Sequence, residues 1–138
     1  MSEFVRDPLV ESIIGAAIRV HRALRPGLLE SAYKTCLSYE FVKLGLKFDR
    51  EVPVPIVYEA ARLDCAYRLD LLVEGSVIVE VKSVEKLLPI HTAQVMTYLR
   101  LTGARHLLLL NFNCLTLKEG LKSFVGTGIR VPQDGGPG

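Results

Sequence analysis

The sequence predicts an α/β protein whose helices and strands follow one another in the order α-α-β-β-β-α-β. Three observations support this prediction. Apolar residues recur at helical spacing after Asp7-Pro8, two apolar runs flank a Glu74-Gly75-Ser76 turn, and residues 107–110 form an unbroken apolar run. Spacing by three and four residues is typical of an amphipathic helix, and short branched runs around a turn are typical of strands.

The three predicted helices have recognisable ends. Asp7 and Pro8 suit the N-cap and the first position of a helix over residues 7–24. A second helix is predicted over residues 28–44 and a third over residues 88–102. A glycine follows each of these two segments, as is common after a helix C-terminus.

The first predicted strand covers residues 46–58 and contains two prolines. Pro53 and Pro55 lie in one register of this strand, where each removes a donor from the ladder. The strand should therefore have a free edge along part of its length. The remaining predicted segments are a turn at 59–64, the hairpin at 67–82, a buried strand at 106–112 and a short helical segment at 117–124.

Length and composition predict one domain over residues 1–131 and a disordered, Gly/Pro-rich tail over 132–138. A chain of 138 residues can bury roughly two thirds of its unfolded surface. The hydrophobic fraction of 49% is high for a small protein. Either the core is large, or a second subunit covers apolar surface. A homodimer is one assembly that this composition allows, with the proline-bearing strand and the first helix as its candidate surfaces.

Charge and cysteine usage exclude several classes of protein. A net charge of +2 neither requires nor excludes nucleic acid. The three cysteines are far apart and form no C-x-x-C motif, which argues against a zinc site, an iron–sulfur cluster or a disulfide framework and predicts a cytoplasmic location. The first residues lack an apolar signal core. Because the run at 107–110 is far too short to span a bilayer, no membrane partner is expected.

Charged residues interrupt the apolar hairpin at Asp70, Glu80 and Lys82. Side chains alternate along a strand, so Glu80 and Lys82 share a face about 7 Å apart, and a tight turn brings Asp70 beside Glu80. Two carboxylates can hold a hard cation such as Mg²⁺, which activates water for phosphodiester hydrolysis. A neighbouring ammonium can stabilise the charge that develops. On the residues alone, an ion pair on a solvated strand face remains an alternative.

Other polar residues have both functional and structural explanations. Glu30 begins the second helix, where the helix dipole favours an acid, so the residues alone favour a structural role. Gln94 and Tyr98 are four residues apart on the third helix, which follows the strand of Glu80 and Lys82. They can reach a metal-bound water or a phosphate, or they are ordinary residues of a helix flank. The candidate phosphate contacts are Arg50, Arg68, Lys86 and Arg100.

Five segments resemble, in order, the GxxExxY protein family of the PD-(D/E)XK nuclease superfamily, in its RecB-like branch. They are Gly27-Leu-Leu-Glu30-Ser-Ala-Tyr33, Tyr67-Arg-Leu-Asp70, Glu80-Val-Lys82, Gln94-Val-Met-Thr-Tyr98-Leu and Asn111-Phe112. The resemblance covers residues 13–125. It implies a restriction-endonuclease-like core, in which a central mixed β-sheet is flanked by helices.

The resemblance also implies a reaction and a set of roles. Members of this superfamily bind Mg²⁺ or Mn²⁺, and the metal ligands would be Glu30, Asp70, Glu80 and the backbone carbonyl of Val81. Lys82, Gln94 and Tyr98 would assist the attacking water or hold the nucleic acid backbone. The predicted function is therefore metal-dependent hydrolysis of DNA. Two alternatives stay open: a catalytically inactive nuclease-fold module that binds nucleic acid or a protein partner, and a dimeric structural subunit of a larger assembly.

Overall fold

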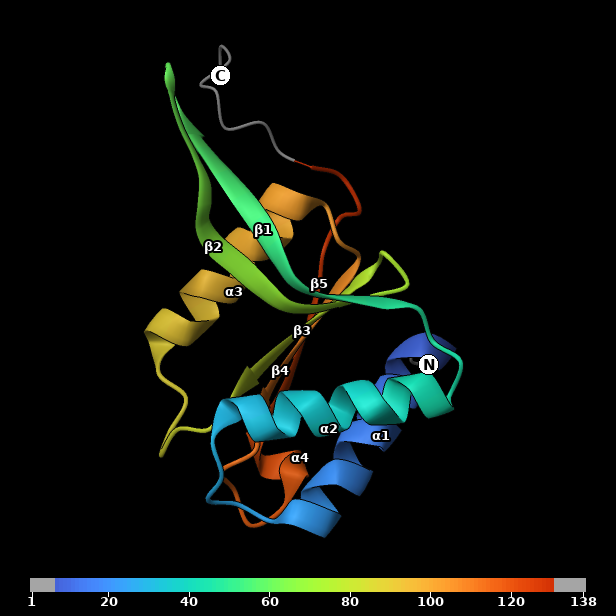
Figure 1. The fold of residues 1–138 in the computed structure, drawn as a ribbon. Coiled ribbons are helices and arrows are strands. Elements are labelled where there is room, and N and C mark those ends of the chain that lie inside the picture. Colours follow the sequence, from blue (N-terminus) through green and yellow to red (C-terminus); the bar gives the residue numbers. More distant parts are fainter. Residues whose placement is uncertain (1–6, 131–138) are drawn as a thin grey trace, which may run out of the picture.

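A single mixed sheet organises residues 7–130, which are the residues that the computed structural model describes (Figure 1). Its strands, in spatial order, are β1 (Phe48–Tyr58), β2 (Ala61–Val73), β3 (Val77–Lys82), β4 (His106–Asn111) and β5 (Leu121–Val125). All neighbours are antiparallel except β3 and β4, which are parallel. A parallel pair needs a crossover connection, and helix α3 (Pro89–Thr102) supplies it.

The helices begin and end where the local signals predict. Helix α1 (Pro8–Leu24) is capped by Asp7, whose Oδ1 accepts from the backbone N–H groups of Leu9 at 2.8 Å and Val10 at 3.2 Å. Helices α2 (Glu30–Lys43) and α3 are each followed by a glycine with φ of 72°. This left-handed conformation is the one that glycine adopts without steric cost.

The β2–β3 hairpin closes through a tight turn. Glu74 has φ of 51° and Gly75 has φ of 65°, and the N–H of Ser76 donates to the carbonyl of Val73 at 3.0 Å. Two consecutive left-handed residues match the twist of the flanking strands. The predicted hairpin is confirmed, and its register places Leu72 opposite Ile78.

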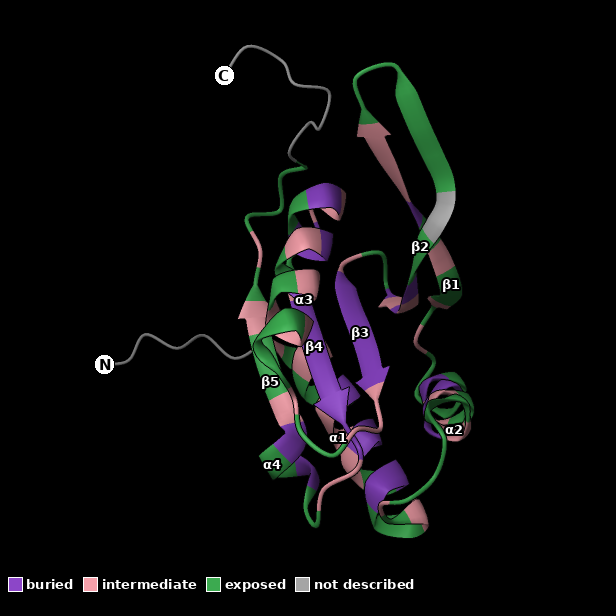
Figure 2. Ribbon diagram, turned by 90° about the vertical axis from the view of Figure 1, so that its left-hand side faces the viewer, coloured by how far each residue is buried: buried purple, intermediate pink, exposed green. Residues whose placement is uncertain are grey.

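The sheet is covered on both faces, which explains the continuous apolar runs of β3 and β4. Helices α1 and α2 cover one face and α3 covers the other (Figure 1). Along β3, Val79 and Val81 pack with α1 and α2, whereas Ile78 packs with α3. Strands buried on both faces lose the polar alternation of half-exposed strands. Figure 2 shows β3 and β4 almost wholly buried.

Two segment predictions are wrong. The turn predicted at 59–64 is much shorter, because β2 already begins at Ala61. The outer part of the β1–β2 ladder projects from the body of the protein (Figure 2), so Arg62 and Asp64 are exposed and give no strand pattern. The helix predicted at 117–124 is also too long. Helix α4 covers only Leu117–Gly120, and the residues after it pair with β4 as β5.

The proline prediction for β1 is consistent with the sheet order, in which β1 is an edge strand. The tail predicted at 132–138 lies outside the described residues. Within residues 7–130, no helix is both long enough and apolar enough to cross a membrane.

Candidate active site

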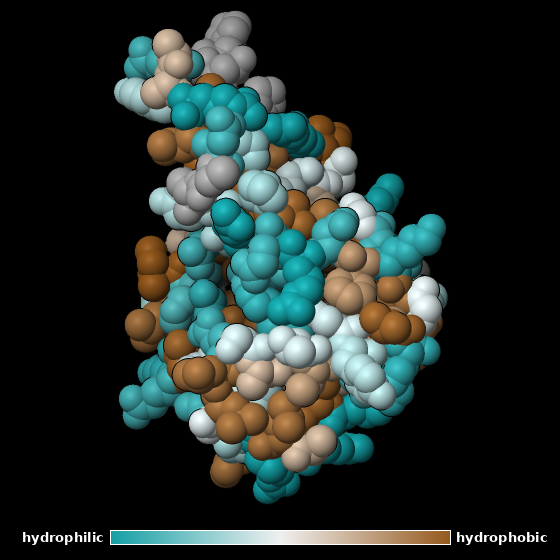
Figure 3. All heavy atoms as spheres, in the orientation of Figure 1, coloured by the Kyte–Doolittle hydropathy of each residue, from teal (hydrophilic) through white to brown (hydrophobic). Residues whose placement is uncertain are grey.

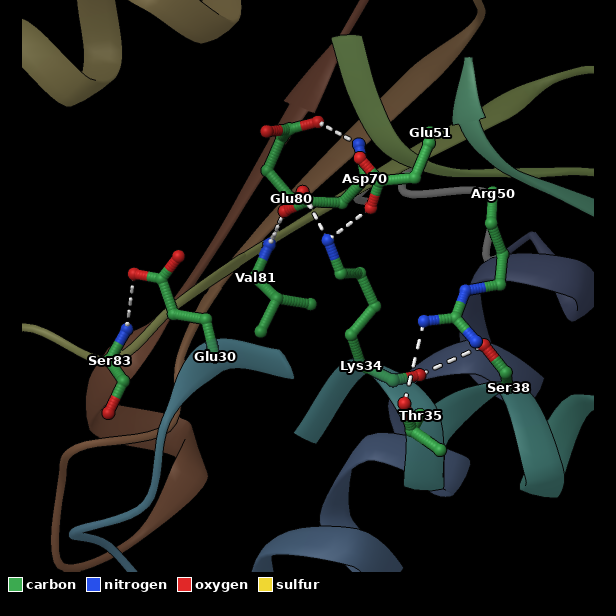
Figure 4. Close-up of polar contacts among 10 residues, drawn as sticks. All are labelled: Glu30, Lys34, Thr35, Ser38, Arg50, Glu51, Asp70, Glu80, Val81 and Ser83. Carbon is green, nitrogen blue, oxygen red and sulfur yellow. Dashed lines mark hydrogen bonds and ion pairs between the residues drawn. The ribbon is translucent and has the colours of Figure 1, made fainter. Parts of the chain in front are cut away.

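The candidate site lies where β2 and β3 separate. Their ladder ends at the pair of Leu71 and Val79. Beyond it, the N–H of Asp70 donates to Glu80 Oε2 at 2.9 Å, and the N–H of Val81 donates to Asp70 Oδ2 at 2.7 Å (Figure 4). Each carboxylate thus accepts from a backbone group that the opposite strand no longer pairs. The two acids lie side by side, as the hairpin register predicts.

The carbonyl of Val81 is directed toward the same opening between β2 and β3, which is the strand gap. In an extended strand the N–H and the carbonyl of one residue point to the same side. Because the Val81 N–H reaches Asp70, the carbonyl of Val81 also points toward β2 rather than β4. Two carboxylates accept hydrogen bonds at this place, and strand geometry directs the Val81 carbonyl toward it as well.

A lysine from helix α2 contacts the acids at the strand gap, and together Lys34, Glu51, Asp70 and Glu80 form a charged cluster. Lys34 Nζ donates to Asp70 Oδ1 at 3.1 Å and to Glu51 Oε2 at 2.5 Å, and the lysine side chain is 14% exposed (Figure 4). Burial lowers the pKa of Lys34, but hydrogen bonds and charge attraction from Glu51 and Asp70 outweigh it, so that the pKa is raised overall. The ammonium is therefore charged at neutral pH.

Glu80 is the most deeply buried acid of the cluster, with 4% exposure. Burial, and then the charge of Asp70, raise the pKa of Glu80 to about 8. The hydrogen bond from the Asp70 backbone and the charges of Lys82 and Lys34 oppose this shift. Without a metal, Glu80 is thus mostly protonated at neutral pH. A divalent cation would favour its ionised form.

Lys82, Gln94 and Tyr98 line one open groove of about 530 Å³ between the end of β3 and α3. Burial, and then the charges of Glu80 and Asp70, raise the pKa of Tyr98 to about 12. Tyr98 therefore keeps its hydroxyl proton and can donate a hydrogen bond in this groove. The structure brings these three predicted residues together on the α3 side of the sheet.

Glu30 lies at the end of β3 but not beside the other two acids. It is the first residue of α2, and its Oε2 accepts from the N–H of Ser83 at 3.1 Å (Figure 4). Ser83 Oγ in turn donates to the carbonyl of Leu28 at 2.7 Å, which ties the start of α2 to the end of β3. Among residues 7–130, no three His, Cys, Asp or Glu side chains are grouped closely enough to hold a metal ion.

The four predicted phosphate contacts do not form a single patch. Arg50 donates to Thr35 Oγ1 at 3.4 Å and lies next to the Lys34 cluster (Figure 4). Lys86 lines a different pocket, together with Lys122. Arg100 is two residues from Tyr98, which places it on nearly the opposite side of α3. Arg68 is exposed on β2. In the view of Figure 3, hydrophilic residues gather over β1 and β2 above α2.

Sequence reasoning missed Lys34 and Glu51, and it gave no role to Asn111, which belongs to the fifth family-like segment. Lys34 follows Glu30 by four residues, so the helical spacing could have placed both on one side of α2. Glu51 has φ of 54°, which the sequence does not indicate. Asn111 is buried and holds the segment after β3, since its side chain accepts from Val84 N–H at 3.0 Å and donates to Val84 carbonyl at 2.9 Å.

A comparison with family models gives a match over almost the whole described chain. The model of the PD-(D/E)XK nuclease superfamily matches residues 7–124. The chain belongs to the PD-(D/E)XK nuclease superfamily. Comparisons with curated proteins and with solved structures gave no match. The predicted α/β fold with a nuclease-like core is confirmed, and the family indicates a nuclease of a kind that generally uses divalent metals.

The residues at the strand gap fit such an ion. Asp70, Glu80 and the Val81 carbonyl offer oxygen atoms, which hard cations such as Mg²⁺ and Mn²⁺ prefer. Asp70 already binds one cation in the structure, the ammonium of Lys34. The gap therefore has the oxygen donors that a divalent ion requires.

Proposed function

We propose that this protein is a Mg²⁺- or Mn²⁺-dependent nuclease that hydrolyses phosphodiester bonds in DNA. The observation that supports this most strongly is the pair of carboxylates at the strand gap. The carboxylates of Asp70 and Glu80 each accept a hydrogen bond from the backbone of the opposite strand there, and Lys82 is close enough to lower the pKa of Glu80. A buried acid with a strongly raised pKa is typical of functional sites.

In this proposal Asp70, Glu80 and the Val81 carbonyl hold the metal. Glu30 becomes a further ligand once its side chain leaves the Ser83 N–H, from which it accepts in the structure. The metal would lower the pKa of a bound water and neutralise charge on the transition state. Lys82 provides positive charge where the reacting phosphate gains negative charge. Tyr98 and Gln94 donate hydrogen bonds that orient the water or the DNA backbone in the groove that they share with Lys82.

DNA binding in this proposal rests on Arg50, Arg68, Lys86 and Arg100 as phosphate contacts. Contacts to phosphate fix the position of a protein on DNA but carry no sequence information. We therefore expect little sequence specificity. Since the four residues are spread over separate elements, single substitutions should each weaken DNA binding only modestly.

The experiment that tests the proposal compares wild type with Asp70→Asn. Asparagine keeps an oxygen that can accept from the Val81 N–H but removes the charge. Wild type should bind Mn²⁺ saturably in a calorimetric titration and cleave single- or double-stranded DNA at protein excess, and the variant should do neither. The control is Asp64→Asn on the same strand, where the exposed Asp64 pairs with Arg62. Wild type that neither binds Mn²⁺ nor cleaves DNA or RNA would support the inactive binding module instead.

Three finer assignments belong to the same proposal. The motif residues Gly27, Glu30 and Tyr33 favour the GxxExxY branch of the superfamily, in its RecB-like part. The scattered cysteines favour a cytoplasmic location. The apolar composition is compatible with a homodimer, and light scattering that shows a monomer at high concentration would remove that assembly.

A further inference from the structure

A half-buried ammonium lies against Asp70 at the strand gap. Lys34 Nζ lies 3.1 Å from Asp70 Oδ1, while the other oxygen of Asp70 accepts from the N–H of Val81. Both carboxylate oxygens of Asp70 are thus engaged, one by a backbone donor and one by a cation. The side chains of Lys34 and Asp70 are 14% and 20% exposed, so water screens this ion pair only in part.

The conformation of β1 provides a second, independent observation. Glu51, the other partner of Lys34, has φ of 54°, a left-handed conformation that a non-glycine residue rarely adopts. Its neighbours Arg50 and Val52 pair with Leu71 and Leu69 in the regular ladder. Strand β1 therefore departs from regular strand geometry at Glu51, whose carboxylate contacts the lysine. Such local strain persists where surrounding contacts hold it in place.

We propose that Lys34 is the resident counter-cation of the metal-free site, and that a divalent metal binds Asp70 in competition with it. This inference rests on the proposed function, because it assumes that Asp70 and Glu80 hold the metal. Lys34 then has two effects. It keeps the Asp70 carboxylate fixed at the gap when no metal is present, and it lowers the affinity of the site for metal.

The size of the second effect follows from Coulomb repulsion. At an assumed separation of about 5 Å, a divalent ion and an ammonium would repel one another enough, even at the dielectric constant of water, to weaken metal binding by roughly tenfold. The half-buried setting of Lys34 makes the repulsion stronger than in water. Replacing Lys34 by a neutral residue should therefore tighten Mn²⁺ binding by about tenfold or more.

The test uses Lys34→Met, Lys34→Gln and the matched control Lys43→Met. Methionine removes the charge at similar length, and glutamine can still donate a hydrogen bond to Asp70, which protects the fold if methionine does not. Lys43 lies on the same helix and pairs with Glu40 at 3.3 Å, so its replacement also removes a lysine–glutamate pair. Mn²⁺ affinity is measured by calorimetry, and the melting temperature is measured with chelator and with Mn²⁺.

The expected result is a tighter Mn²⁺ dissociation constant in both Lys34 variants and an unchanged one in Lys43→Met. With chelator the Lys34 variants should melt at lower temperature than wild type, and Mn²⁺ should raise their melting temperature by more than it raises that of wild type. Equal or weaker Mn²⁺ binding by the Lys34 variants would overturn the competition while leaving the metal site intact. If no protein binds Mn²⁺, even with a short DNA oligonucleotide present, the proposed metal site fails and this inference fails with it.

Discussion

Replacing Glu80 by glutamine should make the metal-free protein more stable at alkaline pH. Burial and the charge of Asp70 raise the pKa of Glu80 to about 8, from an ordinary value of 4.5. Between these two values the folded protein retains a proton that the unfolded chain has lost. The free energy of unfolding therefore falls as pH rises through this window, and the loss is complete only above the folded pKa. Glutamine cannot ionise, and its carbonyl oxygen can still accept from the Asp70 N–H.

The expected size of the effect is large compared with the stability of a small domain. Each unit of pKa shift corresponds to about 1.4 kcal/mol. From pH 5 to pH 8, the free energy of unfolding of wild type should thus fall by about 3–4 kcal/mol relative to that of Glu80→Gln. Whole domains of this kind are stable by only about 5–15 kcal/mol. Wild type should therefore be clearly less stable than the variant at pH 8 and nearly equal to it at pH 5.

Denaturant unfolding with chelator at pH 5, 6, 7 and 8 measures this difference directly. The control is Glu59→Gln, which removes an exposed carboxylate from the turn between β1 and β2. Its pH dependence should follow that of wild type. If Glu80→Gln also followed wild type across this range, Glu80 would not be the group that retains the proton, and the account of its buried environment would be refuted.

Three further predictions concern the metal, a buried hydroxyl and a close backbone approach. Mn²⁺ affinity should rise by up to about tenfold per pH unit from pH 6 to 8 and then level off, because binding requires ionised Glu80; a flat calorimetric profile would contradict this. Tyr33→Phe should lower the free energy of unfolding in urea by about 1–2 kcal/mol. The Tyr33 hydroxyl donates to the Arg25 carbonyl at 2.6 Å and accepts from the Leu28 N–H at 3.0 Å, and the variant loses both hydrogen bonds. Unchanged stability would mean that water replaces both bonds. Gly120→Ala should lower the free energy of unfolding by more than about 2 kcal/mol, since a Cβ there would lie 2.1 Å from the Asn111 carbonyl oxygen. The control Gly15→Ala, in the interior of α1, should raise the free energy of unfolding by about 0.5–1 kcal/mol. Equal effects of the two glycine substitutions in the same unfolding assay would contradict the packing at Gly120.

Local sequence signals predicted the parts of the fold that local interactions determine. Asp7 before Pro8 predicted the start of α1, and the glycines after α2 and α3 predicted where those helices end. The Glu74-Gly75 turn fixed the register of the hairpin, which is why Asp70 could be placed beside Glu80. These features depend on residues that are neighbours in the chain or are joined by one short turn.

The sequence did not predict features that depend on distant segments. Lys34 reaches Asp70, 36 positions later, only because α2 packs against the sheet at the point where β2 and β3 separate. The end of that ladder has no local signal, since Leu69 and Leu71 continue the apolar pattern on both sides of Asp70. The outer part of β2 was missed for a related reason. It lies beyond the body of the protein, so no core imposes a strand pattern on it (Figure 2).

The strand gap also determines which substitutions can reveal chemistry at this site. Asp70 and Glu80 each accept a hydrogen bond from the backbone as well as carrying charge. Alanine at either position would leave a backbone donor unpaired, which would lower the free energy of unfolding by about 1–3 kcal/mol. Lost activity in an alanine variant could then result from the structural role of the residue as readily as from a catalytic role. Asparagine and glutamine remove the charge and keep an acceptor oxygen. If Asp70→Asn unfolds like wild type in chelator but no longer binds Mn²⁺, the carboxylate is needed for metal and not for closing the gap. If the variant still binds Mn²⁺, the role of Asp70 is to accept the hydrogen bond from β3, and the metal must be bound by other residues.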